Sequence, residues 1–368
     1  MSAARAWLFA ALLLGAACAP DRGDAYLASF AAAERAFHAG RYLEAAGAWR
    51  QAAGRAGRVK DRDEALFLEA RAIERTGNWA EARAAYDRLA DLSPTGPRTA
   101  RARFDAANLE IEHGDPARGW ALLDEATRRF PRHGLARVSI RRMIRHAGDT
   151  GGPAAALAWL DAHEKIFTGT DHEEVIAYER GLALDRAGKK AEGHDVLIAS
   201  ARRHPYPSGG LTDDAFSRAA TIDEERGRHE EAIAHLRELL ASREPASGGA
   251  SYERPRYSEA QLRIALIYRD KLHDRAAARR EFERLYERHA TTINRDDALW
   301  NAALLARLDR DADATCRLAR RLVSELPESR YASCAHAICE AVPRGKRECA
   351  DYIMREVRGE KRDEGAPR

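Results

Sequence analysis

The sequence predicts an all-α fold, built as an α-solenoid of repeated helix–turn–helix units. Ala, Arg, Glu and Leu dominate the 368 residues, and these residue types favour helices. Glycines that suit tight turns also recur at intervals of 37, 37, 34, 40 and 39 residues, at Gly40, Gly77, Gly114, Gly148, Gly188 and Gly227. A period of this length is typical of stacked helical hairpins, so we expect about seven or eight units.

The clearest unit runs from Gly77 to Pro94. Gly77 suits a tight turn, and Pro94 cannot continue a helix. Between them, large and small apolar residues are spaced by three and four, which places them on one face of a helix: Trp79, Ala82, Tyr86 and Leu89. The other units keep a small residue at the position of Ala82, which allows two helices to approach closely: Ala45, Gly119, Gly193 and Ala232.

The helix before each turn has its own pair of residues at the same distance from the turn: Ala106-Ala107, Arg180-Gly181, Ala219-Ala220, Ile264-Ala265 and Ala302-Ala303. In this pattern the chain resembles the tetratricopeptide repeat from about Tyr26 to Arg330. The resemblance implies a right-handed superhelix in which the first helix of each unit lines a groove for partner proteins. The unit around Ile264–Phe282 and the joint Leu326–Ala332 are similar to those of bacterial envelope lipoproteins, including Tol-type and β-barrel-assembly proteins.

Two stretches interrupt the repeats. In the fourth unit, Gly148-Asp-Thr-Gly-Gly-Pro153 replaces a compact turn, and residues 241–256 are rich in residues that form loops. We therefore expect an N-terminal block over 26–240, a linker over 241–256 and a C-terminal block over 257–357. The last residues, 358–368, are charged and contain Gly and Pro, which predicts a disordered tail.

The N-terminus predicts export. Arg5 precedes an apolar run over 6–17, which is shorter than the ~20 residues that span a bilayer and fits a signal peptide over 1–17. Leu14-Gly-Ala-Ala-Cys18 resembles a bacterial lipobox, which implies a lipidated Cys18 and a short linker over 18–25. Ala19 in place of Asp implies the outer membrane and its periplasmic face. An ordinary cleaved signal peptide is the alternative.

Four cysteines fall in the last fifth of the chain: Cys316, Cys334, Cys339 and Cys349. In an exported protein, four cysteines predict two disulfides that staple the C-terminal cap. Loops centred near Leu326 and near 342–344 favour pairing Cys316 with Cys334 and Cys339 with Cys349. The rival pairing joins Cys316 to Cys339 and Cys334 to Cys349. The spacings of 18, 5 and 10 contain no CxxC pair, so we expect no zinc site.

Composition and motifs argue against an enzyme and against nucleic-acid binding. Charged residues make up 32% of the chain, yet the net charge is only +3, without the clustered basic residues of a nucleic-acid interface. The HExxH, phosphate-loop and GxSxG patterns are absent. We therefore expect no catalytic residue, metal, cofactor or small-molecule substrate.

An aromatic position recurs early in the first helices. Phe30, Phe67 and Phe104 are 37 residues apart, and Tyr178 and Trp300 occupy the equivalent place. These rings either fill the interface between units or form a stripe that faces a peptide or a helix in the groove. With the second interpretation, the candidate groove is Phe30, Phe67, Arg71, Arg75, Phe104, Asn108, Tyr178, Arg186 and Trp300.

These features together predict a scaffold that is anchored by Cys18 and binds other envelope proteins. The alternative is a protein that associates with peptidoglycan, related to lytic transglycosylases but without their catalytic domain. A third hypothesis is a lipoprotein exposed on the cell surface. The sequence does not identify the partner.

Overall fold

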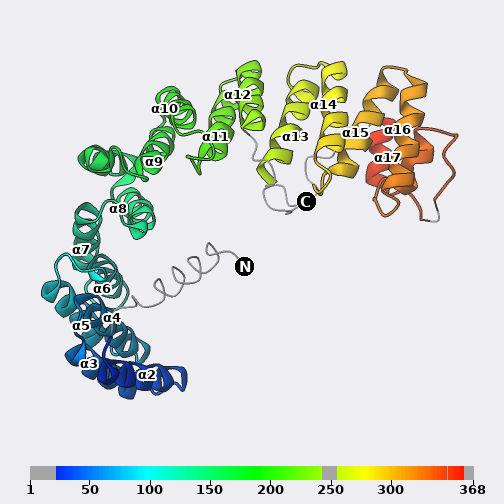
Figure 1. Cartoon of the computed structure of the whole chain (residues 1–368). Helices are drawn as coiled ribbons and strands as arrows, with labels where there is room; N and C mark the ends of the chain where they lie inside the picture. The colour runs from blue at the N-terminus through cyan, green and yellow to red at the C-terminus, as the bar shows by residue number, and fades with distance from the viewer. Residues whose placement is uncertain (1–21, 243–254, 346, 360–368) are drawn as a thin grey trace, which may run out of the picture. The chain divides into compact units, whose positions relative to one another are not determined.

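A computed structural model describes residues 22–242, 255–345 and 347–359, and these residues are helical hairpins joined in chain order (Figure 1). Within each compact unit, consecutive helices pack against each other, which confirms the predicted all-α solenoid. The chain divides into two compact units at Glu173–Glu174. Among the described residues, no helix combines the length and apolarity that crossing a bilayer requires.

The first unit contains four hairpins. Their helices are α2 (Asp24–His38), α3 (Tyr42–Arg55), α4 (Val59–Arg75), α5 (Trp79–Leu92), α6 (Thr99–His113), α7 (Pro116–Arg129) and α8 (Gly134–Phe167). Helix α8 is itself a hairpin, because its backbone leaves helical geometry at Gly152, with φ 73° and ψ −176°. A Cβ at Gly148 would lie 3.8 Å from that of Ala156, so the chain folds back on itself there.

The second unit contains four further hairpins and a cap. Its helices are α9 (Glu173–Arg186), α10 (Lys190–Arg203), α11 (Thr212–Glu225), α12 (His229–Ala241), α13 (Pro255–Asp270), α14 (Arg275–Arg288), α15 (Arg295–Leu308) and α16 (Ala312–Glu325). The cap consists of the 3-10 helix η1 (Ala332–Ala337) and α17 (Asp351–Arg358). The eight hairpins of the described residues agree with the predicted number of units.

The turns explain the periodic glycines. Gly40, Gly77, Gly188 and Gly227 have φ between 72° and 82°, a backbone conformation that glycine adopts without steric cost. Gly114 and Gly148 differ from this prediction. Gly114 has φ −122° and Gly148 lies within α8, whose reversal occurs at Gly152. In the last two hairpins, His273 and Arg310 take the positive φ, at 54° and 60°.

The small residues of the repeat mark the closest approaches between helices. A Cβ added at Gly119 in α7 would lie 2.5 Å from the backbone nitrogen of Ile111 in α6. A Cβ at Gly193 in α10 would lie 2.8 Å from the carbonyl oxygen of Gly181 in α9. Such separations leave no room for a side chain, so the sequence pattern reports helix contact at these positions.

The cap is held by two disulfides, in the rival pairing rather than the favoured one. Cys316 is bonded to Cys339 and Cys334 to Cys349. The favoured pairing assumed a regular hairpin after α16. The chain instead forms the short η1, and α17 begins only at Asp351, so Cys349 precedes a helix rather than facing Cys339 across a loop. Cys339 packs with Ala319, beside Cys316.

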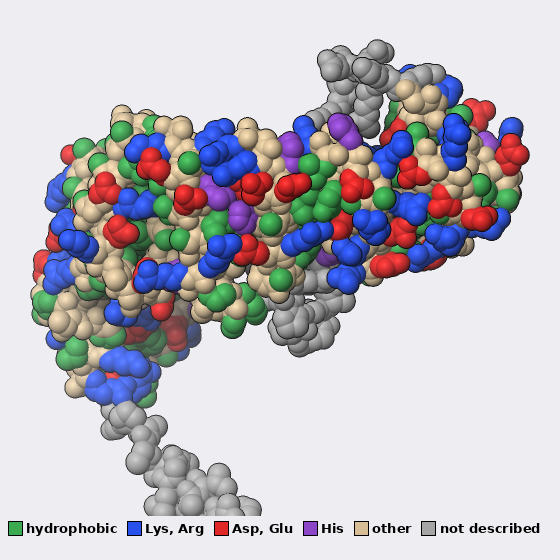
Figure 2. Space-filling view, turned by 90° about the horizontal axis from the view of Figure 1, so that it is seen from above, with side chains coloured by type: hydrophobic (Ala, Val, Ile, Leu, Met, Phe, Trp, Pro, Cys, Tyr) green, Lys and Arg blue, Asp and Glu red, His purple; other side chains and the backbone are tan. Residues whose placement is uncertain are grey.

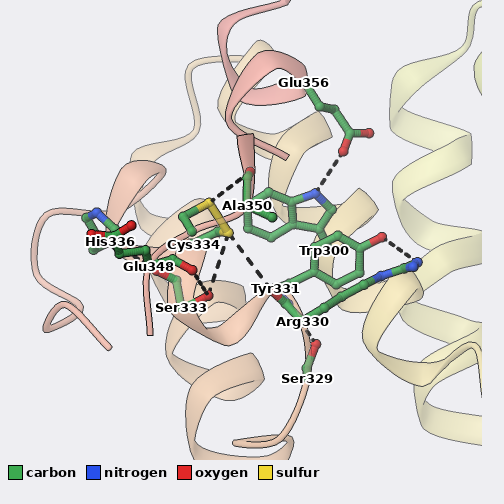
Figure 3. The surroundings of a disulfide bond; sticks show 11 residues. Trp300, Ser329, Arg330, Tyr331, Ser333, Cys334, His336, Glu348, Ala350 and Glu356 are labelled. Atoms are coloured by element: carbon green, nitrogen blue, oxygen red, sulfur yellow. Dashed lines mark hydrogen bonds between the residues drawn. A yellow bond between two sulfur atoms is a disulfide. The ribbon is translucent and has the colours of Figure 1, made fainter. Parts of the chain in front are cut away.

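Helix α15 also binds the cap. The ring of Trp300 stacks on that of Tyr331, with centroids 4.9 Å apart, and its Nε1 donates to Glu356 of α17 over 3.3 Å (Figure 3). Arg307 donates to the carbonyl of Val357 at 2.9 Å. The cap therefore covers the apolar end face that a solenoid would otherwise expose.

Several predicted segments lie outside the described residues: the signal peptide over 1–17, Cys18, most of the linker over 241–256 and residues 360–368 of the tail. The division into blocks at 241–256 therefore stays a prediction.

Candidate functional site

The aromatic positions of the candidate groove divide into two groups. Phe67, Phe104 and Trp300 are 4%, 1% and 0% exposed, so these three rings are packed inside the fold and are removed from the groove. Phe67 contacts Tyr86 with centroids 5.6 Å apart. Phe104 stacks on His133 at 5.7 Å. The repeat spacing alone could not distinguish core from groove, because both recur once per unit.

Phe30 and Tyr178 are half-buried. Phe30 lies against Tyr26 and Trp49, with centroid separations of 5.5 and 6.4 Å. Tyr178 packs on the core of the second unit. Both rings therefore contribute mainly to packing, and only their edges reach solvent.

The polar positions of the candidate groove lie largely at the surface. Arg71, Arg75 and Arg186 are exposed. Asn108 is half-buried, and its Oδ1 accepts a hydrogen bond from Arg142 at 2.5 Å. Charge, rather than an aromatic stripe, thus characterises the accessible part of the first helices.

In the first unit these positions form a surface that we call the α4–α6 stripe: Arg71 and Arg75 on α4, with Asp105, Asn108 and Glu112 on α6. The two helices contribute equivalent positions, since Asn108 and Glu112 follow Arg71 and Arg75 by one 37-residue repeat. Acidic and basic side chains are also interspersed over the visible face in Figure 2.

The charges of the stripe act on one another. Arg101 pairs with Asp105 at 2.8 Å. Burial raises the pKa of Asp105, and the guanidinium groups of Arg101 and Arg71 offset this only in part, while Glu74 of α4 adds to the rise. The faces of α4 and α6 are therefore electrostatically coupled, as neighbouring groups at short range must be.

The fold also brings together three residues that the sequence analysis did not select. They are His194 of α10, Asp223 of α11 and His235 of α12. Asp223 Oδ2 lies 3.2 Å from His194 Nε2 and 2.9 Å from His235 Nδ1. The Asp223 side chain is 0% exposed, and its Oδ1 accepts from Arg228. Among the described residues, these three are the group whose donor atoms could hold a metal ion.

Local motifs could not reveal this cluster, because its members are 29 and 12 residues apart in the sequence. The stacking of consecutive hairpins brings the three residues together. Asp223 lies near the C-terminal end of α11, the first helix of the sixth hairpin, and α11 packs against both α10 and α12. Polar residues on these three helices meet only once the hairpins stack.

A second buried His–Asp group lies between α7 and α8 in the first unit. Asp124 Oδ1 is 2.9 Å from His163 Nε2 and accepts from Trp159 Nε1 at 2.9 Å. Burial raises the pKa of Asp124, but the hydrogen bonds from His163 and Trp159 outweigh it and hold the pKa below its ordinary value. The rings of Trp159 and His163 stack with centroids 4.0 Å apart.

Part of the chain is similar to a known family of helical repeats. Residues 64–96, which include α5 and most of α4, match the model of the tetratricopeptide repeat family. No curated protein matches the sequence significantly.

Among solved structures, a tetratricopeptide repeat protein from Parabacteroides merdae is 12% identical, with a TM-score of 0.36 over 77% of this chain and 99% of that one. The C-terminal part of a TPR repeat-containing protein from Cytophaga hutchinsonii is 12% identical, with a TM-score of 0.45 over 73% and 99%. The family match lies on the second hairpin, within an all-helical arrangement of consecutive hairpins.

Proposed function

We propose that the chain is a non-enzymatic scaffold that binds other proteins through the first helices of its hairpins. The observation that supports this most is the α4–α6 stripe. Arg71, Arg75 and Glu112 are exposed, and polar residues recur at these positions from one hairpin to the next, whereas the buried aromatic rings of the same helices are used for packing. A surface of this kind recognises a partner by the placement of charges along an extended segment or a helix.

The stripe suits a partner that carries both signs of charge. Arg71 and Arg75 offer cations on α4, and Glu112 offers an anion one repeat later. Asp105 is held between cationic and acidic neighbours. A partner of uniform charge would face repulsion at one end of the stripe, which favours a mixed-charge segment.

For the cellular setting, we propose a lipid anchor at Cys18 on the periplasmic face of the outer membrane, with envelope proteins as partners. The support is the apolar run over 6–17 followed by the lipobox-like Leu14–Cys18. Palmitate labelling of the wild type and of Cys18→Ala tests the anchor. Label in the wild type that disappears in Cys18→Ala is expected, and an unlabelled wild type would contradict it.

Position-resolved photocrosslinking in the native host tests the binding surface. A photoreactive residue is placed singly at Arg71 or Arg75, and, as matched controls, at Leu43 of α3 or Leu92 of α5, which are 72% and 55% exposed on second helices. We expect one discrete protein adduct from the α4 positions and none from the controls. Equal adducts from all four positions, or capture of the peptidoglycan sacculus instead of a protein, would contradict the proposal.

A further inference from the structure

We propose that His194, Asp223 and His235 form a binding site for a divalent transition-metal ion, and that Zn²⁺ is the ion that fits it best. Each of three successive helices supplies one ligand atom: Nε2 from α10, Oδ2 from α11 and Nδ1 from α12. These atoms all lie within 4.8 Å of one another. Two imidazoles and one carboxylate are a donor set that binds zinc and leaves a fourth position for water.

The contacts of His194 are compatible with a bound cation. Its Nδ1 lies 2.8 Å from Asp195 Oδ1 and its Nε2 lies 3.2 Å from Asp223 Oδ2, so both ring nitrogens face carboxylate oxygens. Neutral imidazole has a single N–H and can donate to only one of them, whereas an imidazolium or a metal-bound imidazole satisfies both. A metal ion between Nε2 and Oδ2 satisfies both atoms, while the N–H remains on Nδ1 and donates to Asp195.

The surroundings match those of a metal ligand set. A ligating histidine usually donates its other ring N–H to a carboxylate, which fixes the tautomer and orients the ring. Asp195 occupies that place beside His194. Arg228 binds Oδ1 of Asp223 and so leaves Oδ2 turned toward the two imidazoles. Arg228 also adds positive charge, which lowers the affinity of the site for a cation.

The geometry requires adjustment at each ligand. Ligand atoms around tetrahedral zinc, at bond lengths of ~2.0–2.2 Å, are separated by roughly 3.3–3.5 Å. The two separations to Oδ2 are 3.2 and 2.9 Å, so the carboxylate needs to withdraw by a few tenths of an ångström. The two imidazole nitrogens lie within 4.8 Å of each other, so side-chain rotation has to bring them to the tetrahedral spacing. Imidazole ligands favour zinc, nickel or copper over calcium and magnesium, which prefer oxygen.

The site lies where two hairpins join. Helix α10 belongs to the fifth hairpin, and α11 and α12 form the sixth. An ion bound by all three would therefore fasten the joint and raise the stability of the second unit in proportion to its occupancy. This adds to the proposed scaffold function and does not depend on it, because the site is separate from the α4–α6 stripe.

Isothermal titration of the full-length protein with Zn²⁺ under non-reducing conditions tests the proposal. The oxidised state keeps the four C-terminal cysteines in their disulfides. We expect one ion per chain for the wild type and a loss of at least about 100-fold in affinity for His235→Gln or His194→Gln. His38→Gln, which removes an exposed histidine of α2, is the control and should bind as the wild type does.

Asp195→Asn is a second test variant that should fold as the wild type does, because the Asp195 side chain is 80% exposed. If Asp195 orients His194, this variant should bind zinc about 10- to 100-fold more weakly with unchanged circular dichroism. Co²⁺ bound to the wild type should show the intense visible absorption of a tetrahedral site. No binding by the wild type, or binding that His194→Gln and His235→Gln leave unchanged, would overturn the proposal.

Discussion

The two buried His–Asp groups differ in what surrounds the carboxylate. Asp124 in the first unit accepts from an indole N–H and lies beside one histidine, whereas Asp223 in the second unit lies between two histidines. An indole N–H donates but has no lone pair for a metal. Asp124 therefore forms a hydrogen-bonded joint between α7 and α8, while the groups around Asp223 can also bind an ion.

Loss of the carboxylate charge should affect the two groups unequally, and this is the largest effect that we expect. Asp223→Asn leaves Arg228 and the two histidines around a neutral side chain that is 0% exposed, and should lower the free energy of unfolding by about 3–5 kcal/mol. Asp124→Asn, at a side chain 20% exposed, should lower it by about 1–2 kcal/mol. Urea unfolding followed by circular dichroism measures both. Equal losses of unfolding free energy in the two variants would contradict the distinction between Asp124 and Asp223.

The glycines that bring helices together within a hairpin should behave alike in the two units, in contrast to the two His–Asp groups. Gly119→Ala and Gly193→Ala each force a Cβ against backbone atoms and should destabilise the protein by about 1–3 kcal/mol. Gly47→Ala in α3, where a Cβ meets nothing within 4 Å, should stabilise it by about 0.5–1 kcal/mol. Thermal unfolding ranks the three. A neutral Gly119→Ala would mean that α6 and α7 are not in close contact.

Acid should weaken the Asp124 joint in a defined direction. The pKa of Asp124 is lowered in the folded protein, so its contribution to stability is present above the unfolded value of ~3.9 and is lost as the pH falls through the folded value. The stability difference between wild type and Asp124→Asn should therefore shrink below pH ~4. Urea unfolding at several pH values checks this, and a difference that grows in acid would contradict it.

The turns provide the smallest contrast between the units. Gly77 has φ 82°, whereas Arg310 takes a φ of 60° with a full side chain. Arg310→Gly should therefore stabilise the protein by about 0.5–1 kcal/mol, because the left-handed conformation is strained for residues with a Cβ. Gly77→Ala should do the reverse. Thermal melting of both variants measures the effect, and destabilisation by Arg310→Gly would show that its side-chain contacts dominate.

Sequence periodicity predicted the fold well, because each hairpin repeats the same local requirements. Positions such as Gly77 and Gly119 carry steric constraints that can be recognised one unit at a time. The turns at Gly114 and in the fourth unit were exceptions: Gly114 has a negative φ, and Gly152 rather than Gly148 reverses the chain in the fourth unit. Several glycines in succession offer more than one place for a turn, and only packing selects among them.

The site was less predictable, because its features depend on contacts between units. Phe67 is buried against Tyr86 of the next helix and Trp300 against the cap, and the spacing of the aromatic residues specifies neither contact. The disulfides were paired differently from the favoured prediction because the cap departs from the hairpin pattern. The cluster at Asp223 draws one residue from each of three helices, so no local motif indicates it.

The count of zinc ions bound by matched variants tests the contrast between the two groups most directly. We would dialyse the wild type, His163→Gln and His235→Gln to equilibrium against the same free Zn²⁺ concentration and measure the zinc bound per chain. One ion in the wild type and in His163→Gln, with none in His235→Gln, is the predicted result. Zinc that is lost with His163→Gln but kept in His235→Gln would contradict the distinction between Asp124 and Asp223.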